Sequence, residues 1–176
     1  MGYVKSTGTD SGSISEINFL VVGYTCQDHL LIDLDGCSLY KADRIARMIR
    51  EEWPWVGMCL VVESSPMHHH LVYDSKLPWG MITSIVQTLA ALGVVEKNYA
   101  QVRTFRRDLT LRVSDKHGVE RYRPVPKPLY MIGYNLVSGQ PYGVRRYLQT
   151  LQAFINLDEF AGRYPCLQRS LQGTGT

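Results

Sequence analysis

Residues 56–73 read VGMCLVVESSPMHHHLVY, and this stretch decides the fold. Residues 56–63 and 69–73 are mostly apolar or β-branched, and the Ser-Ser-Pro sequence at 64–66 separates the two runs. Runs of this length on either side of a proline-containing turn are typical of two strands of one hairpin. The stretch therefore predicts an antiparallel strand pair within a mostly antiparallel sheet.

The residues before this hairpin predict two more strands and a helix. Runs of strand length occupy 17–24 and 29–34, and the turn-like residues between them predict another hairpin. Apolar side chains then recur at helical spacing over 41–53, where Pro54 ends the pattern. We expect an amphipathic helix there.

The residues after the hairpin predict further helices and strands. Residues 81–92 are apolar on nearly all sides and end at Gly93, which indicates a buried helix. Residues 109–114 alternate Leu-Thr-Leu-Arg-Val-Ser, so a strand there would turn Arg112 toward an open sheet face. The remaining expected elements are a short strand at 129–132 and helices at 144–155 and 157–169.

These elements predict an α+β fold in which a mostly antiparallel sheet carries helices packed on one side. The length of 176 residues fits a single domain with a core of its own. We expect that domain to span 16–171. Residues 1–15 and 172–176 are rich in Ser, Thr and Gly and offer little to bury, so we expect them to be disordered.

The composition argues against several classes of protein. The four cysteines are widely separated and form no CxxC pair, which favours free thiols in a reducing compartment over a zinc module or a redox motif. No apolar run approaches the roughly 18 to 20 residues of a transmembrane helix. The first residues also lack the apolar region of a signal peptide. We expect a soluble protein of the cytoplasm.

The net charge of +3 is unevenly distributed. Residues 97–127 contain nine basic and three acidic side chains, so this segment carries +6 and the rest of the chain −3. A basic segment beside an acidic metal site suits a protein that handles phosphates. The alternative is a solvated basic face.

Two carboxylates flank one leucine in the sequence Asp33-Leu34-Asp35. Because side chains alternate along a strand, Asp33 and Asp35 are expected to point to the same side. Like charges at that spacing either raise one pKa or bind a cation, and hard oxygen ligands suit Mg²⁺ or Mn²⁺. The alternative is a strand end at the surface, where both carboxylates are simply solvated.

Three consecutive histidines open the second strand of the central hairpin. Alternation places His68 and His70 on one face and His69 on the other. We expect the aspartate strand to be the neighbour of this strand, which would bring the imidazoles beside the carboxylates. The alternative is a polar loop tip with solvated side chains.

These motifs resemble those of the archaeo-eukaryotic primase, or primase-polymerase, superfamily, in the minimal catalytic form of plasmid and phage members. Asp33-Leu34-Asp35 is similar to its first motif, and residues 64–73 are similar to the Ser-x-His-type element that opens a strand. The resemblance covers about 17–132 and implies an RRM-like fold. The turn position usually held by glycine in this family is Met67 here.

The resemblance implies a template-dependent nucleotidyltransferase that joins nucleotides by a two-metal mechanism on single-stranded DNA. It implies two Mg²⁺ or Mn²⁺ ions held by Asp33, Asp35 and a third carboxylate, for which Asp108 is the choice and Asp74 and Asp115 are alternatives. The partners would be template DNA, nucleoside triphosphates and a helicase or replication protein supplied separately.

The resemblance also implies how the substrates are bound. The incoming triphosphate would meet Ser64, Ser65, His68, His70 and Arg112, with His70 the better match to the family histidine and His68 an accessory. The template backbone would meet Arg103, Arg106, Arg107 and Lys116. Candidates for stacking on bases, with core packing as the alternative for each, are Tyr73, Tyr99, Tyr122 and Phe105.

Two other functions remain open. A rolling-circle Rep or relaxase-type nickase also uses an RRM-like fold, with a His-x-His metal site that residues 68–70 would imitate and a tyrosine nucleophile, for which Tyr99 is a candidate. That mechanism gives the two aspartates no required place. A non-catalytic RRM-like nucleic-acid-binding module would show no dependence on divalent metal.

Overall fold

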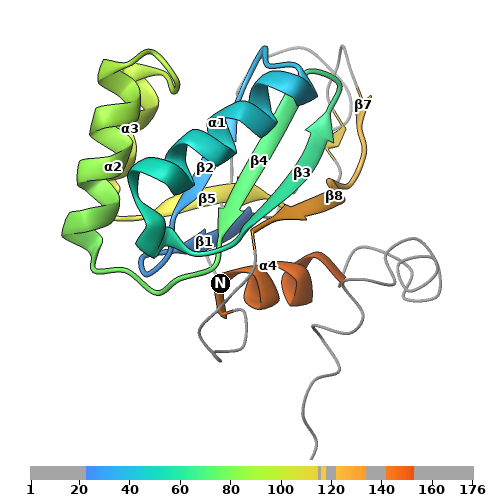
Figure 1. The fold of residues 1–176 in the computed structure, drawn as a ribbon. Coiled ribbons are helices and arrows are strands. Elements are labelled where there is room, and N and C mark those ends of the chain that lie inside the picture. The colour runs from blue at the N-terminus through green and yellow to red at the C-terminus, as the bar shows by residue number, and fades with distance from the viewer. Residues whose placement is uncertain (1–22, 115, 118–121, 134–141, 153–176) are drawn as a thin grey trace, which may run out of the picture.

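The computed structural model describes residues 23–114, 116–117, 122–133 and 142–152. Its central sheet has four antiparallel strands. In spatial order they are β2 (Leu31–Leu34), β4 (His68–Tyr73), β3 (Cys59–Ser65) and β8 (Lys127–Ile132). Figure 1 shows β4 and β3 as the middle of this sheet.

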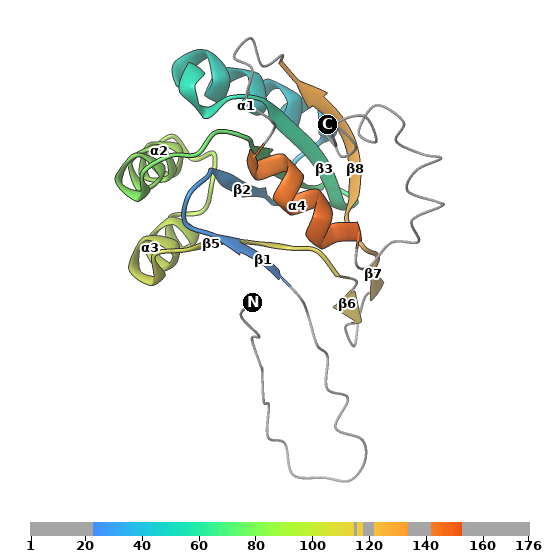
Figure 2. The same ribbon diagram turned by 90° about the horizontal axis from the view of Figure 1, so that it is seen from below.

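Two further strand pairs adjoin this sheet. β1 (Gly23–Cys26) pairs antiparallel with β5 (Leu109–Arg112), and β5 contacts β2. β6 (Lys116–His117) and β7 (Tyr122–Arg123) form a short antiparallel pair. The β1–β5 pair thus extends the structure on the β2 side of the central sheet (Figure 2).

The described residues also form four α-helices and one short 3-10 helix. They are α1 (Leu39–Glu52), η1 (Pro54–Val56), α2 (Trp79–Ala91), α3 (Lys97–Arg106) and α4 (Tyr142–Gln152). The Ser38 side chain accepts a hydrogen bond from the Lys41 backbone N–H at 3.3 Å and so caps the start of α1. Pro54 ends the helix because its ring cannot continue the backbone hydrogen bonding.

The two faces of the central sheet carry different helices. The Tyr73 hydroxyl donates to the backbone oxygen of Ala46 at 3.3 Å, which places α1 on the Tyr73 side of β4. His70, three residues earlier, faces the opposite side and is hydrogen-bonded through Nδ1 to the Tyr147 hydroxyl of α4 at 3.3 Å. α1 therefore covers one face, and α4 lies across the other (Figure 1, Figure 2).

The strands β3 and β4 form the centre of the core. Val61, Val62, Leu71 and Val72 are fully buried although successive residues point to opposite faces. Burial on both faces explains why these strands are continuous apolar runs rather than alternating sequences. The centre of the core is thus formed by residues 56–73, the stretch that predicted the hairpin.

The predicted fold class, α+β with a mostly antiparallel sheet, is confirmed. The expectation that the helices pack on one side of the sheet does not hold for α4, which lies across the face opposite α1. The central hairpin and the helices expected at 41–53 and 81–92 are also present, with boundaries shifted by one to three residues. The hairpin expected between 17–24 and 29–34 is wrong, because β1 pairs with β5 and β2 with β4.

Some of the predicted segments lie outside the described residues, and other predictions can be compared with the structure. The predicted terminal segments and the helix at 157–169 lie outside them. Cys26, Cys37 and Cys59 are buried free thiols, as expected. Within the described ranges, none of the helices combines the length and the apolar character needed to cross a membrane.

Candidate active site

The register of β2 against β4 brings the two sequence motifs together. Asp33 lies directly opposite His70, and Leu34 lies opposite His69. Opposed residues of an antiparallel pair share a face, and residues two positions apart along a strand do so as well. Asp33, Asp35, His68 and His70 therefore lie on one face and His69 on the other, as the alternation predicted.

Each aspartate of this face is matched with one histidine. His68 Nδ1 is hydrogen-bonded to Asp35 Oδ1, and His70 Nε2 lies 3.7 Å from Asp33 Oδ1. The side chains of Asp35 and His68 are 58% and 26% exposed, whereas those of Asp33 and His70 are 36% and 3% exposed. Solvent consequently reaches both carboxylates and the His68 imidazole, whereas the imidazole of the inner pair, Asp33 and His70, is enclosed.

In the inner pair, the histidine does not offset the charge of the carboxylate. Burial, and then the neighbouring Asp35 carboxylate, raise the pKa of Asp33 to about 6. Burial, and then the charge of Arg112, lower the pKa of His70 to about 3. At neutral pH the imidazole is therefore neutral and does not compensate the ionised Asp33. A divalent cation would relieve the repulsion between the Asp33 and Asp35 carboxylates, and their oxygens are suitable ligands for it.

The turn between β3 and β4 presents two serines beside these pairs. Ser64 Oγ donates to the backbone oxygen of His68 at 3.3 Å, whereas the buried Ser65 Oγ has no hydrogen-bond partner among the described residues. Met67 has a positive φ of 64°, a conformation that favours glycine. Its backbone oxygen accepts from the Cys37 N–H at 2.7 Å, which ties the turn to the start of α1.

Arg112 reaches this turn from β5. Its guanidinium donates to the backbone oxygens of Ser64, of Ser114 at 2.5 Å and of Pro124 at 2.7 Å. These carbonyl contacts hold the Ser64 backbone in place, and the charge of the guanidinium acts on both Asp33 and His70. Arg112 lies on β5, the strand predicted for it. Its contacts with backbone oxygens indicate that it holds the turn in position.

Asp108 immediately precedes β5, and its Oδ1 lies 3.3 Å from Nη1 of Arg103 on α3. The carboxylates of Asp33, Asp35 and Asp108 do not form a closed group of three. Among the described residues, such a group, with all ligand atoms within 4.8 Å of one another, is formed by Cys26, Asp28 and His29.

The two alternatives for the third carboxylate are placed differently. Asp74 follows the far end of β4 and accepts from the Val144 backbone N–H at 3.4 Å, so it holds the start of α4. Asp115 lies outside the described residues. Asp108 as the third carboxylate stays a prediction, and its partner in the structure is Arg103.

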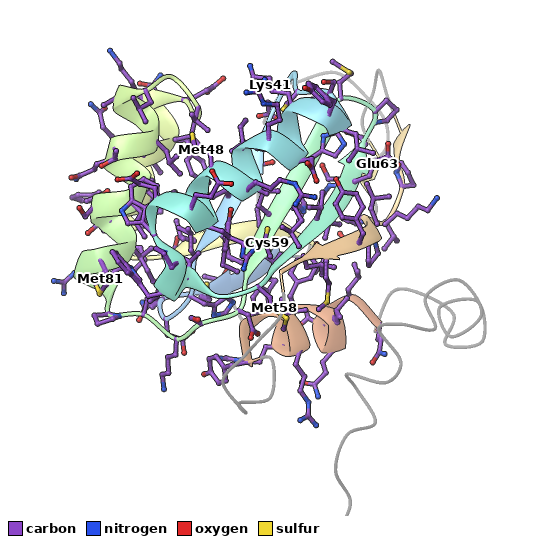
Figure 3. The ribbon with its side chains drawn as sticks, viewed as in Figure 1. Lys41, Met48, Met58, Cys59, Glu63 and Met81 are labelled. Carbon is purple, nitrogen blue, oxygen red and sulfur yellow. The ribbon has the colours of Figure 1, made fainter. Side chains whose placement is uncertain are left out.

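A cavity of about 240 Å³ adjoins the carboxylates. It is lined by Asp33, Leu34, Asp35, Cys37, Lys41, Ile45, Gly93, Val94, Val95, Glu96 and Tyr99. Lys41, at the N-terminal end of α1 in Figure 3, is a cationic lining residue that the sequence analysis missed. The sequence feature that could have identified Lys41 is its place in the first turn of a helix that directly follows the aspartate strand.

The remaining predicted residues lie on or near α3. Arg103 is partly buried, pairs with Asp108 and lies over the Tyr99 ring at 5.4 Å. Arg106 and Arg107 are exposed at the end of the helix, and Arg107 has a positive φ of 56° at the C-cap. The side chain of Lys116 lies outside the described residues.

The Cys26, Asp28 and His29 group is internally satisfied. His29 is fully buried, with Nδ1 2.9 Å from Asp28 Oδ1 and Nε2 3.1 Å from the Tyr24 hydroxyl. Cys26 Sγ donates to the His29 backbone oxygen at 3.1 Å, and burial raises the pKa of this thiol to about 12. The Tyr142 hydroxyl of α4 donates to Asp28 at 2.8 Å. These contacts anchor α4.

Comparison with protein-family models, curated protein sequences and solved structures found no match for this chain. The function of the chain must therefore be inferred from its motifs and from the geometry of the β2–β4 face.

Proposed function

We propose that this protein is a nucleotidyltransferase of primase type, which joins nucleotides on a single-stranded DNA template. The observation that carries the proposal is the register that sets Asp33 opposite His70. Paired carboxylates and two histidines share one face next to a serine-containing turn, and the two carboxylates line a cavity. This combination supports phosphoryl transfer better than a solvated strand end, because both carboxylates line a cavity and the pKa of Asp33 is raised by burial and by Asp35.

Asp33 and Asp35 would hold the divalent cations, Mg²⁺ or Mn²⁺, and Asp108 would join them on release from Arg103. When bound, such cations neutralise the charge of a triphosphate and lower the pKa of an attacking hydroxyl. The raised pKa of Asp33 and the unpartnered Ser65 hydroxyl are the features of this chain that fit a charged ligand.

The exposure of the two histidines assigns them different tasks. His68 is the more accessible imidazole and would contact the triphosphate, while the enclosed His70 would lie beside Asp33 as a neutral group. Lys41 would add positive charge at the cavity. Arg112 would act through the Ser64 backbone that it holds.

The template would lie along the basic residues that the sequence analysis selected. Arg106 and Arg107 are exposed and would meet the phosphate backbone, with Arg103 and Lys116 beside them. A helicase or replication protein would be supplied separately. A cytoplasmic location is part of the same proposal.

The test is incorporation of labelled nucleotides on a primed and on an unprimed single-stranded template, with Mg²⁺ or Mn²⁺ and with ribo- and deoxyribonucleotides. The double variant Asp33→Ala/Asp35→Ala is expected to lose at least about 100-fold in rate, because metal-based stabilisation contributes several kcal/mol. Glu51→Ala, an exposed acidic position on α1 outside the cavity, is the matched control. Equal incorporation by parent and double variant would overturn the proposed site.

The nickase is the second candidate, and one observation favours it. The Tyr99 hydroxyl is buried, lacks a partner among the described residues and belongs to a residue that lines the cavity with Asp33. Against it, burial raises the pKa of Tyr99 above its ordinary value, which disfavours the nucleophilic phenolate. Covalent attachment of DNA to the protein, lost in Tyr99→Phe, would establish the nickase. Under the primase proposal Tyr99→Phe keeps nucleotide incorporation.

The binding module makes a third, distinct outcome. Salt-sensitive binding to single-stranded DNA without incorporation, cleavage or dependence on divalent metal would replace both enzymes.

A further inference from the structure

An apolar groove lies between α2 and α3, at the end of the molecule where these helices pack on each other (Figure 1). Its volume is about 490 Å³. The lining residues are Gln87, Ala90, Ala91, Lys97, Ala100, Gln101, Thr104 and Phe105. Three of these eight residues are alanines, whose small side chains leave the groove open.

An exposed aromatic side chain lines this groove. Phe105 is 90% exposed, and Leu92 and Val102, each next in sequence to a lining residue, are 64% and 48% exposed. A fully exposed phenylalanine beside an apolar depression is unfavourable in water, and such patches mark sites of interaction. The groove therefore has the shape and the chemistry of a receptor for apolar side chains.

The helix α3 separates this groove from the candidate active site. The groove residues Ala100, Thr104 and Phe105 recur at helical spacing on one side of the helix. Tyr99, Arg103 and Arg106 recur on the opposite side, where Tyr99 lines the active-site cavity and Arg103 pairs with Asp108. A ligand in the groove would not occupy the nucleotide site.

The charges on the two helices select the kind of ligand. α2 contains no charged residue, and two of the three cations of α3, Arg103 and Arg106, lie on the side away from the groove. Lys97 lines the groove itself. An apolar segment that also carries negative charge would complement this surface.

We propose that the α2–α3 groove binds an acidic amphipathic peptide segment of a partner protein, which inserts apolar side chains beside Phe105 and places carboxylates near Lys97. A single-stranded nucleic acid fits less well, because the lining offers one cation and Phe105 points away from the Arg103 side of the helix. The inference is independent of the proposed function, since no groove residue belongs to the candidate active site.

The first experiment is selection from a random dodecapeptide library displayed on phage, with the full chain as bait. We expect enriched peptides to combine Leu, Phe, Trp or Met with Asp or Glu. Synthetic fluorescent versions are then titrated with the full chain by anisotropy. Binding in the micromolar range, weaker at higher salt, is the expected result.

Variants locate the bound peptide. Phe105→Ser and Lys97→Glu are each expected to weaken binding about tenfold or more, as truncation of a central aromatic contact commonly does. The matched controls are Trp55→Ser, another exposed aromatic residue, and Arg44→Glu, another exposed cation, and both should bind as the parent does. Unchanged melting temperatures would show that the variants fold.

Four outcomes would overturn this inference. They are the absence of enriched peptides, enrichment of peptides without acidic residues, binding that Phe105→Ser leaves unchanged, and self-association or DNA binding that Phe105→Ser abolishes. The first three remove the peptide site, and the last assigns the groove to a second copy or to DNA.

Discussion

Two aspartate–histidine pairs in this molecule have opposite electrostatic environments. At Asp28, burial alone would raise the carboxyl pKa, but hydrogen bonds from Tyr142 and His29 outweigh it and the pKa is lowered. At Asp33, burial and the Asp35 charge raise the pKa to about 6, and the nearby His70 stays neutral. The carboxylate of the first pair accepts hydrogen bonds within the protein, whereas that of the second lies 3.7 Å from a neutral imidazole and is 36% exposed, so a ligand can reach it.

This difference teaches that residue types alone do not identify a site. Cys26, Asp28 and His29 form the tighter group of possible metal ligands, yet both nitrogens of His29 already have partners. The Asp33 and Asp35 carboxylates are farther from a closed ligand set, but a cavity adjoins them and they repel each other. The less satisfied group is the better candidate for function.

The largest expected effect comes from Asp33→Asn. Nucleotide incorporation should fall at least about 100-fold because the variant cannot supply an anionic ligand. The same variant should be more stable than the parent at pH 7 by about 1 kcal/mol, since it removes a repelled, partly buried charge. Denaturant titrations and incorporation assays on the same preparations measure both. If Asp33→Asn lost stability as well as activity, the Asp33–His70 pair would not differ from the Asp28–His29 pair in the way described.

The sign of this stability gain can be checked by pH. The folded-state pKa of Asp33, about 6, lies above the ordinary value of 3.8, so ionisation destabilises the native state as pH rises from about 4 through 6. The advantage of Asp33→Asn should thus be present at pH 7 and disappear near pH 4. A constant advantage at both pH values would assign it to another cause.

Asp28→Ala should produce the opposite result. It removes the charged acceptor of Tyr142, Arg146 and His29 and should lower the free energy of unfolding by about 2 kcal/mol at pH 7. Because the pKa of Asp28 is below 3.8, this penalty is present above about pH 4 and fades as the pH falls further. Incorporation per folded molecule should be retained, and Glu51→Ala serves as the control for loss of an exposed carboxylate.

Metal affinity should depend on pH through Asp33. With a pKa of about 6, the carboxylate is mostly ionised at pH 7 and mostly protonated at pH 5, so apparent Mn²⁺ affinity should fall about tenfold between these values. Titration of Mn²⁺ followed by electron paramagnetic resonance measures it. Binding that is lost in Cys26→Ser but kept in Asp33→Asn would move the metal to the other pair.

The smallest expected effect is that of Met67→Gly. Met67 has a left-handed backbone conformation at a turn, and glycine there should stabilise the protein by up to about 1 kcal/mol. Thermal unfolding measures the change. Arg107→Gly is the matched comparison at the other non-glycine residue with positive φ, at the end of α3. Destabilisation by Met67→Gly would mean that contacts of the methionine side chain outweigh the backbone cost.

The local parts of this structure were predictable. The hairpin of β3 and β4, the faces of the histidines and the helices α1 and α2 follow from periodicity, a proline turn and helix-ending residues that act within a few positions. The helix α3 was missed because its apolar residues are few and its polar residues surround the axis. The boundaries of the strands were least certain, since tertiary pairing sets their ends.

The sequence was sufficient to place Asp33 with Asp35 and His68 with His70, because side-chain alternation is a property of the strand itself. The tertiary structure alone decided that Gly23 pairs with Arg112, that Tyr147 covers His70 and that Arg103 holds Asp108. These contacts join residues far apart in the chain, and their free energy depends on complementary surfaces that form only when the elements pack. No local pattern records that complementarity, so the partners of each charge, and with them its pKa, are properties of the folded molecule.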